Sequence, residues 1–481
     1  MKLISIIITL LWITTAVHAE KIEGYVFADT NNNGKLDNGE VGISGVWISN
    51  QRDFVQSDKN GFYEIEKLEN RLVYVVKPAT YSVKNYYCPI DETVKNFALI
   101  PKQKKDTFEI LVVGDPQMRI EKTLHAFQED IVTEMLNYNP EFSIILGDIA
   151  DNDLTMYSAA KDIVNTLPYP VFPVLGNHDV NYKAASADQE ADVFQQWWGP
   201  DYYTFNEGDV HFVVLNNILY KGWDVNNNKQ GDYFGGISEI QYEWLKKDLS
   251  LIPKEQLVVL CMHIPLLERY TYPKEIQRIF SLLEKHNHIL ALSGHLHTIE
   301  NYFFDTKTGW KYPQPFQNIT VGAACGGWWC GPMDERSLPV STCTDGSPNG
   351  YFKFSFIGNK YSYDFIPANH RTDFQMKIVY DENKELLYTN VFSATVNAVV
   401  KVILEDGREL VMENVKERDP FILSTYKQRY NYDNWQPKVE ETQHLWKLPL
   451  PDLGKGVHRL TIVVTDSDSK QYVGYKLIKT E

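Results

Sequence analysis

Short apolar segments separated by turn residues mark the first part of the chain, from residue 21 to about residue 100. Apolar and polar side chains alternate over residues 24–28, 46–49 and 61–65, and Gly, Asn and Asp lie between these segments. Alternation with a period of two places one face of a segment in a core, which is typical of β-strands joined by turns. We therefore predict a small β-sandwich over residues 20–100.

The pattern changes at about residue 107, where apolar runs begin to alternate with stretches of helical period, for example 124–137 and 240–249. Such alternation predicts an α/β (α+β) domain with largely buried strands, which we place at residues 106–365. The segments 101–106 and 366–371 are predicted linkers at its two ends.

Strand-like alternation returns at residues 374–380, 398–404 and 458–464. We therefore predict a C-terminal β-rich accessory domain over residues 372–481. The expected fold class is an α/β core between N- and C-terminal all-β domains.

Residues 1–19 have the pattern of a secretory signal peptide. Lys2 gives a positive start, residues 3–17 are almost entirely apolar, and Ala19 supplies a small side chain at the expected cleavage position. About 15 apolar residues are too few to span a bilayer comfortably, and no later segment is long and apolar enough to do so. We expect an exported protein, whether periplasmic, cell-surface or secreted, without a transmembrane segment.

The net charge of −16 limits the possible partners. A surface with this charge repels nucleic acid phosphates, so we expect no nucleic-acid partner, whereas bound metal ions could still attract a small phosphate substrate. Five cysteines are too few and too unevenly spaced to predict a disulfide framework. The sequence does not point to a protein partner.

Five apolar segments of the central domain end in polar residues that can bind metals. The motifs are Asp115-Pro-Gln117, Asp148-Ile-Ala-Asp151, Asn177-His178-Asp179, His263 and His295-Leu-His297. Because α/β sheets bind ligands beyond the carboxyl ends of their strands, we expect these motifs to converge. Their oxygen and nitrogen donors suit divalent transition metals such as Mn, Fe or Zn. Two such ions can hold an attacking hydroxide and clamp a phosphoester.

Each motif alone has an ordinary structural explanation. Gly-Asp and Gly-Asn are common in turns, and His263 could be a hydrogen-bonded core histidine. His295 and His297 would point the same way if both lay on one strand. The ordered set of five motifs favours the metal site, because independent features then agree.

The order Asp-x-Gln, Gly-Asp-x-x-Asp, Gly-Asn-His-Asp, His and Gly-His-x-His resembles the calcineurin-like metallophosphoesterases over residues 107–365. The layout resembles their secreted bacterial type, with an N-terminal β-sandwich (Ig-like or prealbumin-like) and a C-terminal accessory domain. The resemblance implies two packed mixed β-sheets flanked by helices, an αββα sandwich. It also implies a dinuclear-metal enzyme that hydrolyses small phosphomono- or phosphodiesters by attack of a metal-bridging hydroxide. The alternative is a catalytically weak surface-binding protein that retains the fold.

The resemblance also implies a role for each motif residue. The first metal would be held by Asp115, Asp148 and His297, with Gln117 nearby, and the second by Asp148, Asn177, His263 and His295. His178 would stabilise the transition state or protonate the leaving oxygen. This ring would be oriented by Asp179 and Asp151. The sequence departs from the commonest family pattern at Gln117, where that pattern has His. Gln117 could instead only hydrogen-bond a metal-bound water.

Two loop segments after the last motif are candidates for substrate binding. Trp328 and Trp329 lie in a Gly-rich stretch, and either ring could line the entrance of the site or be buried. Asp345 and Asn349 could add polar contacts to a substrate.

A twelve-residue segment in the N-terminal domain fits a calcium loop. Oxygen-bearing side chains occupy positions 1, 3, 5, 9 and 12, and Gly34 occupies position 6. The candidate ligands are Asp29, Asn31, Asn33, Asp37 and Glu40. A polar turn without an ion is the alternative.

Overall fold

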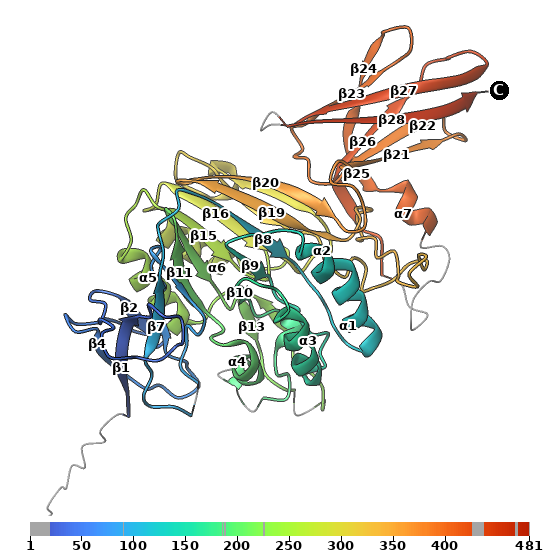
Figure 1. The fold of residues 1–481 in the computed structure, drawn as a ribbon. Coiled ribbons are helices and arrows are strands. Elements are labelled where there is room, and N and C mark those ends of the chain that lie inside the picture. The colour runs from blue at the N-terminus through green and yellow to red at the C-terminus, as the bar shows by residue number, and fades with distance from the viewer. Residues whose placement is uncertain are drawn as a thin grey trace, which may run out of the picture.

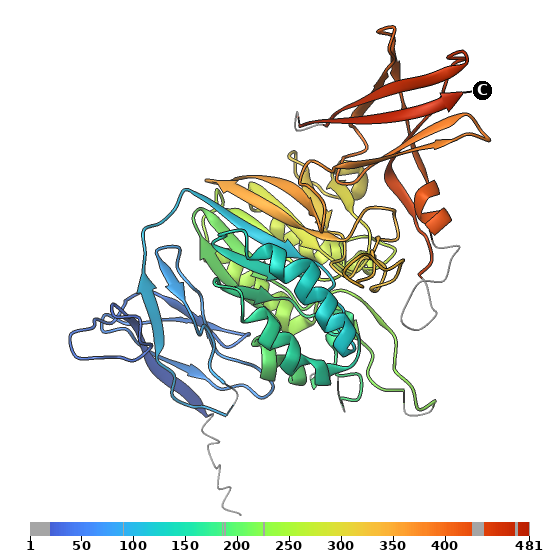
Figure 2. The same ribbon diagram turned by 45° about the vertical axis from the view of Figure 1, so that its right-hand side comes forward.

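A computed structural model of the chain describes residues 20–89, 91–184, 186, 189–224, 227–425, 437–466 and 470–480. The predicted signal peptide, residues 1–19, lies outside the described residues. The central domain lies between the two β domains, which occupy opposite sides of it in both views (Figures 1 and 2). Among the described residues, no helix combines the length and apolarity that a membrane crossing needs.

The N-terminal domain consists of two small sheets. Their strand orders are β4-β1-β7-β6 and β3-β2-β5, and β1 lies antiparallel to β4 but parallel to β7. The strands are β1 Lys21–Ala28, β2 Trp47–Ser49, β3 Phe54–Gln56, β4 Phe62–Glu66, β5 Tyr74–Val75, β6 Tyr81–Val83 and β7 Phe97–Pro101. Side chains of the first half of β1 are alternately exposed and buried, which is the pattern expected from the sequence.

The central domain contains two larger mixed sheets. The first has the order β10-β9-β8-β19-β20 and the second β11-β12-β15-β16-β18-β17. Its strands are β8 Thr107–Val113, β9 Phe142–Ile145, β10 Val171–Pro173, β11 Tyr203–Glu207, β12 Val210–Val214, β15 Leu257–Cys261, β16 His288–Ser293, β17 Glu300–Phe304, β18 Phe316–Thr320, β19 Gly350–Ile357 and β20 Lys360–Pro367, with a separate hairpin of β13 Ile218–Tyr220 and β14 Tyr233–Gly235.

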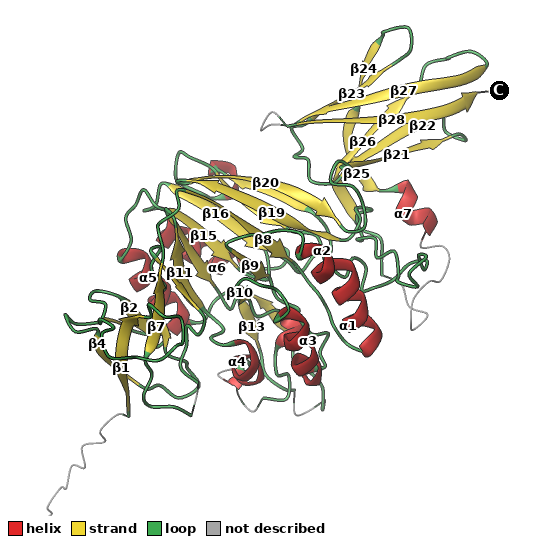
Figure 3. Cartoon of the chain, viewed as in Figure 1, coloured by secondary structure: helices red, strands yellow, loops and turns green. Residues whose placement is uncertain are grey.

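Helices cover the outer faces of the central domain (Figure 3). They are α1 Glu121–Phe127, α2 Thr133–Met135, α3 Tyr157–Val164, α4 Asp192–Trp198, α5 Glu239–Ser250 and α6 Pro273–Leu283. On β8, Ile110 and Val112 share a core with the second sheet, whereas Leu111 and Val113 pack in the core that contains α1 and α3. A strand buried on both faces explains the continuous apolar run, and the predicted αββα fold class is confirmed.

The predicted helix at 124–137 is interrupted. A π-helical turn, Gln128–Val132, lies between α1 and α2. Such a turn adds one residue to a single helical turn, so the apolar pattern on either side of it is still typical of a helix.

The N-terminal domain shares a core with the central domain. The Lys77 ammonium donates to Glu207 Oε2 at 2.8 Å, and the Trp244 Nε1–H of α5 donates to Ser49 Oγ at 3.2 Å. Tyr86 packs against Phe172 of β10. The Lys102 and Lys105 side chains of the predicted linker pair with Glu141 and hold the linker against β9.

The C-terminal domain is formed by two four-stranded antiparallel sheets and one short helix. The strand orders are β21-β22-β26-β25 and β24-β23-β27-β28. The elements are β21 Met376–Asp381, β22 Leu386–Val391, β23 Val399–Ile403, β24 Glu409–Val411, β25 Glu413–Arg418, α7 Pro420–Thr425, β26 Glu441–Pro449, β27 Gly456–Thr465 and β28 Gln471–Thr480. Its sheets enclose a separate hydrophobic core. All five cysteines of the chain are buried free thiols.

Candidate metal centre

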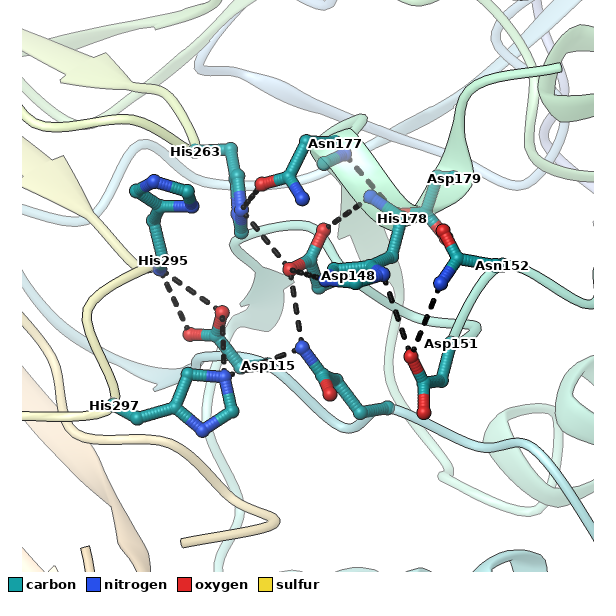
Figure 4. Close-up of polar contacts among 12 residues, drawn as sticks. Asp115, Asp148, Asp151, Asn152, Asn177, His178, Asp179, His263, His295 and His297 are labelled. Atoms are coloured by element: carbon teal, nitrogen blue, oxygen red, sulfur yellow. Dashed lines mark hydrogen bonds and ion pairs between the residues drawn. The ribbon is translucent and has the colours of Figure 1, made fainter. Parts of the chain in front are cut away.

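The five predicted motifs meet at one place, at the carboxyl ends of strands from both central sheets (Figure 4). Asp115, Asp148 and Asn177 follow β8, β9 and β10 of the first sheet. His263 follows β15, and the His295–His297 segment follows β16, in the second sheet. The two sheets therefore build the site jointly.

Asp148 lies at the middle of the cluster. Its Oδ2 lies 3.2 Å from His263 Nε2 and accepts from Gln117 Nε2 at 3.2 Å. His263 Nε2 is also 2.9 Å from Asn177 Oδ1. Ligand atoms of Asp148, His263 and His295 all lie within 4.8 Å of one another, which one cation could bridge. This half of the site contains the residues assigned to the second metal.

Asp115, Gln117 and His297 form the other half. His297 Nε2 lies 3.8 Å from Asp115 Oδ1 and 3.2 Å from Gln117 Nε2. The backbone N–H of His295 donates to both carboxylate oxygens of Asp115, at 2.9 and 3.1 Å. Asp148 borders both halves, which is the position expected of a bridging ligand.

Backbone carbonyls fix the orientation of two histidines. Nδ1 of His263 lies 2.7 Å from Leu146 O, and Nδ1 of His297 lies 2.6 Å from Gly326 O. Each Nδ1 must carry the proton to donate to a carbonyl, so Nε2 is the ring nitrogen left to bind a cation. This is the arrangement commonly found in metal-ligating histidines.

His295 and His297 do not share a strand, contrary to the expectation from their spacing. Both lie beyond the end of β16 and have positive φ angles, 75° and 54°. The two rings therefore reach different halves of the site (Figure 4). The apolar run ends at Leu292 and the strand at Ser293, so both histidines lie in the loop that follows.

Residues with left-handed backbone conformation are concentrated among the proposed ligands, and we call this set the left-handed rim. Asp115, Gln117 and Asp148 have φ values of 47°, 44° and 51°, in addition to the two histidines. Such conformations cost about 1–3 kcal/mol each in residues other than glycine and are retained where geometry matters. The glycines that precede two of the motifs leave no room for a side chain. A Cβ on Gly176 would lie 2.3 Å from Asp148 Oδ1, and one on Gly294 would lie 2.7 Å from Asp115 Oδ2.

Burial shifts the pKa values of the ionisable side chains in the site. It raises the pKa of Asp115 to about 8, and the charge of Asp148 adds to this effect. Burial lowers the pKa of His295 to about 3 and that of His297 to about 4. Burial opposes protonation of His263 as well, but the neighbouring Asp148 raises its pKa to about 9. The site therefore combines the neutral imidazoles of His295 and His297 with buried carboxylates that require a positive charge, which protonated His263 supplies in the absence of a cation.

The donor set fits two divalent cations. Carboxylate, amide and imidazole donors suit borderline metals. The side chain of Gln117 gives a further indication that a cation binds here. Its Oε1 is buried and has no hydrogen-bond partner among the described residues. The Gln117 amide now directs its nitrogen at Asp148 and His297. A half-turn of the amide would direct the unpaired oxygen to the same place, toward a cation.

His178 lies beside the cluster and is partly accessible, with 24% of its side chain exposed. Nε2 is 4.0 Å from Asp148 Oδ2, and Nδ1 is 3.3 Å from Asp151 Oδ1. Asp179 is fully buried and accepts from the backbone N–H of Ile149, Ala150 and Gly176 and from the Tyr157 hydroxyl. Asp151 thus contacts the His178 ring directly, whereas Asp179 fixes the loop that carries Asp148.

The two tryptophans have different surroundings. Trp329 is 1% exposed, and its Nε1–H donates to Pro116 O at 2.9 Å, so it packs under the Asp115 loop. Trp328 is partly exposed and stacks on the His297 ring. Of the two, only Trp328 is placed to face a substrate.

Asp345 and Asn349 are buried in contacts within the protein. Asn349 Nδ2 donates to Asp130 Oδ2 at 2.7 Å and to Ala324 O at 3.0 Å. Asp345 is fully buried and lies 3.0 Å from His444 Nε2 of the C-terminal domain. Their hydrogen bonds join parts of the fold, so the structure assigns both residues to packing and not to contact with a substrate.

The sequence motifs did not include two tyrosines beside His295. The rings of Tyr270 and Tyr233 lie 5.5 and 6.3 Å from the His295 ring, both nearly perpendicular to it. Both are partly exposed. Their only sequence signal is the abundance of tyrosine in the segment that precedes and follows His263.

The candidate calcium loop lies between β1 and β2 of the N-terminal domain. Asp29 is buried and accepts from the backbone N–H of Asn33 and Gly34. Asp37 accepts from the side chains of Asn31 and Asn33, and Glu40 accepts from Thr30 N and Asp37 N. All five predicted ligands thus face one another in a single loop.

Relatives of this chain include enzymes that act on both classes of phosphoester. A probable glycerophosphodiester phosphodiesterase of Arcobacter nitrofigilis is 26% identical over 34% of this chain and 59% of its own length. The human serine/threonine-protein phosphatase CPPED1 is 28% identical over 36% of this chain and 62% of its own. Purple acid phosphatase 15 of Arabidopsis thaliana is 22% identical over 43% of each chain. The matches thus span less than two thirds of these relatives.

Among solved structures, a purple acid phosphatase from yellow lupin aligns over 72% of this chain and 67% of its own, with 12% identity and a TM-score of 0.40. Three family models match successive stretches of the sequence. They describe the N terminal of calcineurin-like phosphoesterase at residues 30–111, calcineurin-like phosphoesterase itself at 108–298, and its C terminal at 319–472. Because the three models match in order along nearly the whole chain, the protein belongs to the calcineurin-like phosphoesterase family.

Proposed function

We propose that the protein is an exported phosphoesterase that uses two divalent transition metals to hydrolyse phosphomono- or phosphodiester bonds. One observation carries the proposal, namely the convergence of seven metal-type donors from both sheets at one buried, strained edge. The names of the relatives include a phosphodiesterase and phosphatases, which supports a phosphoester substrate and leaves both ester classes open.

The proposed division of ligands follows the two halves of the site. Asp115, Gln117, Asp148 and His297 would hold one metal, and Asp148, Asn177, His263 and His295 the other. Bound divalent ions would supply a water nucleophile at neutral pH and offset the charge of the phosphoryl group.

His178 is the proposed proton donor. The ring is partly accessible, and Asp151 Oδ1 lies 3.3 Å from Nδ1 without forming a hydrogen bond with it. With Nδ1 facing this carboxylate, Nε2 is directed toward the cluster, where it can donate to a phosphoryl oxygen or protonate the leaving oxygen. The two tyrosines and Trp328 would line the approach and contact the ester substituent.

Export and calcium binding complete the proposal. The positive, apolar and small-residue order of residues 1–19 supports export to the periplasm, the cell surface or the medium. The Asp29–Glu40 loop would bind calcium and stabilise the N-terminal domain, away from the metal centre.

The experiment compares metal-stripped and reloaded protein. After stripping with a chelator and reloading with Mn²⁺, Fe²⁺ or Zn²⁺, we expect hydrolysis of p-nitrophenyl phosphate, bis-p-nitrophenyl phosphate or both, with two metals bound. Asp148→Asn should lose most of the bound metal and the activity. The same change at the exposed residue Asp162 of α3 is the matched control and should have no effect. Two bound metals without turnover of either ester would instead favour a surface-binding protein that retains the fold.

A further inference from the structure

A buried polar path connects the C-terminal domain to the proposed metal ligand His297. Thr344 and Asp345 lie in the loop between β18 and β19, and both are buried. The backbone N–H and the hydroxyl of Thr344 donate to His297 O, at 3.0 and 3.1 Å. The Asp345 Oδ2 accepts from the backbone N–H of Ile299 at 2.7 Å. The loop thus holds the backbone on both sides of Thr298.

The C-terminal domain holds this loop in turn. Asp345 Oδ2 lies 3.0 Å from Nε2 of His444, which is on β26. The Glu440 N–H donates to Thr344 O at 3.0 Å, and Asn390 Nδ2 of β22 donates to Asp345 O at 2.9 Å. Side-chain and backbone bonds from two strands of the C-terminal domain therefore end on the same two loop residues.

The network is fully satisfied. Asn390 Nδ2 also donates to Asp419 Oδ2 at 2.8 Å, which directs the amide oxygen to Nδ1 of His444, 2.7 Å away. Both ring nitrogens of His444 thus face oxygen atoms of the network. The Asp345 carboxylate also accepts from the N–H and hydroxyl of Ser347. A buried polar network with every partner in place fixes the geometry, and loss of one partner disrupts it strongly.

We propose that the C-terminal domain is a positioning element of the metal centre: His444 fixes Asp345, Asp345 and Thr344 fix the His297–Ile299 backbone, and that backbone sets the place of His297 Nε2. The inference rests on the proposed function, since it concerns a proposed metal ligand. His297 has a left-handed φ of 54°, which persists only where neighbours over-determine it. Asp345 and His444 are positioning residues and touch no substrate.

The path ends on one half of the site. His297 belongs to the half with Asp115 and Gln117. His295 of the other half lies two residues before it, but its backbone N–H donates to Asp115 and not to the Thr344–Asp345 loop. Asn177 and His263 are held by other loops. Disturbance of Asp345 should therefore weaken the metal that His297 binds and affect the other metal little. A contribution to overall stability alone would not discriminate between the two metals.

The test measures both metal affinities in the full-length protein. Stripped wild type, Asp345→Asn and His444→Ala are titrated with Zn²⁺ against a chromophoric chelator, and folding is checked by circular dichroism and Tm. We expect one Zn²⁺ to bind roughly 10–100-fold more weakly in both variants, as is typical when a group supporting a ligand is lost. The second Zn²⁺ should keep its affinity. Asp345→Glu, which restores the charge, should recover part of the loss if the longer side chain is accommodated.

The matched control is Thr395→Ala in the interior of the C-terminal domain. The Thr395 hydroxyl donates to Asp466 Oδ1 at 2.7 Å, a bond that is not part of the path from His444 to His297, so its loss should lower Tm without changing either affinity. Unchanged affinities in His444→Ala, or an equal loss in Thr395→Ala, would overturn the positioning proposal alone. Wild type that binds no Zn²⁺ would overturn this inference and the proposed function together. Wild type that binds two metals and hydrolyses no ester would overturn only the proposed function.

Discussion

The indole ring of Trp328 lies against the imidazole ring of His297, with centroids 3.8 Å apart and planes inclined by 15°. This near-parallel stack covers one face of a proposed metal ligand. Trp328 reaches it with a left-handed φ of 57°, whereas Trp329, with a similar φ of 53°, packs inside the protein. Two adjacent residues of the same type therefore have separable roles.

Replacement of the two tryptophans should have different consequences. Trp328→Ala should lower kcat/KM roughly tenfold, because the His297 ring loses a stacking partner worth about 1 kcal/mol, while the free energy of unfolding changes little. Trp329→Ala should lower the free energy of unfolding by about 3–5 kcal/mol, as expected for a buried Trp. Urea denaturation and steady-state kinetics measure the two effects. Trp328→Phe keeps a ring and serves as the control; equal activity in Trp328→Ala and wild type would exclude a role for the stack.

His178→Ala should retain both metals and lose turnover. The ring lies beside the cluster and is not among its closest donors, so metal content should stay at two per chain. We expect kcat to fall by about 10²–10⁴-fold through loss of proton donation or charge stabilisation. Metal analysis and kinetics on the same sample separate the two properties. A variant that loses metal would show that His178 is itself a ligand.

Gln117 should make the two metal sites unequal. An amide oxygen is a weaker ligand than the imidazole found in the commonest family pattern, so the metal held with His297 should leave first during dialysis against a chelator. Gln117→His should tighten that site. Titration calorimetry on both proteins measures the affinities. Equal, tight binding of two metals in both would show that Asp115, Asp148 and His297 suffice.

Calcium should stabilise the N-terminal domain. A ligand that binds only the folded state stabilises it by an amount that grows with the logarithm of 1 plus its concentration over Kd, and millimolar Ca²⁺ should therefore shift the transition upward by a few degrees. Asp29→Ala removes a buried carboxylate of the loop and should abolish the shift. Differential scanning calorimetry with Ca²⁺ and with Mg²⁺ provides the measurement and its ion control. An equal Ca²⁺ shift in both proteins would locate the effect elsewhere.

The buried Lys77 should make stability depend on pH. Burial lowers the pKa of Lys77 from its ordinary 10.5 to about 8, although Glu207 partly opposes this. Between these values the unfolded chain binds a proton that the folded chain has lost, so the free energy of unfolding should rise with pH. Relative to Lys77→Met, wild type should gain on the order of 2–3 kcal/mol from pH 7.5 to 10. Parallel urea-denaturation results for both proteins over this range would contradict the shift.

The sequence predicted the site well because each ligand directly follows an apolar run, and strand ends are local features. The predicted family and fold class are confirmed by the matched models and the two central sheets. The sequence did not show that three motifs end on one sheet and two on the other, since sheet membership depends on long-range pairing. β8 pairs with β19, whose residues lie more than two hundred positions later.

Asp345 illustrates the limit of local inference. An Asp in a polar Gly-rich loop after the last motif resembles a substrate contact, but its partner His444 lies 99 residues further along the chain in another domain. The two tryptophans are equally instructive, because adjacent identical residues carry no local signal that tells a buried ring from an exposed one.

The left-handed rim has an evolutionary consequence. Asp115, Gln117, Asp148, His295 and His297 hold conformations that glycine would adopt without strain, so each contributes its ligand at the expense of folding stability. A lineage that no longer needed the chemistry would gain stability from glycine at these positions by the same single mutations that erase the donors. Decay of this site would therefore be favoured by selection for stability, and a descendant without activity should melt at a higher temperature than its active ancestor.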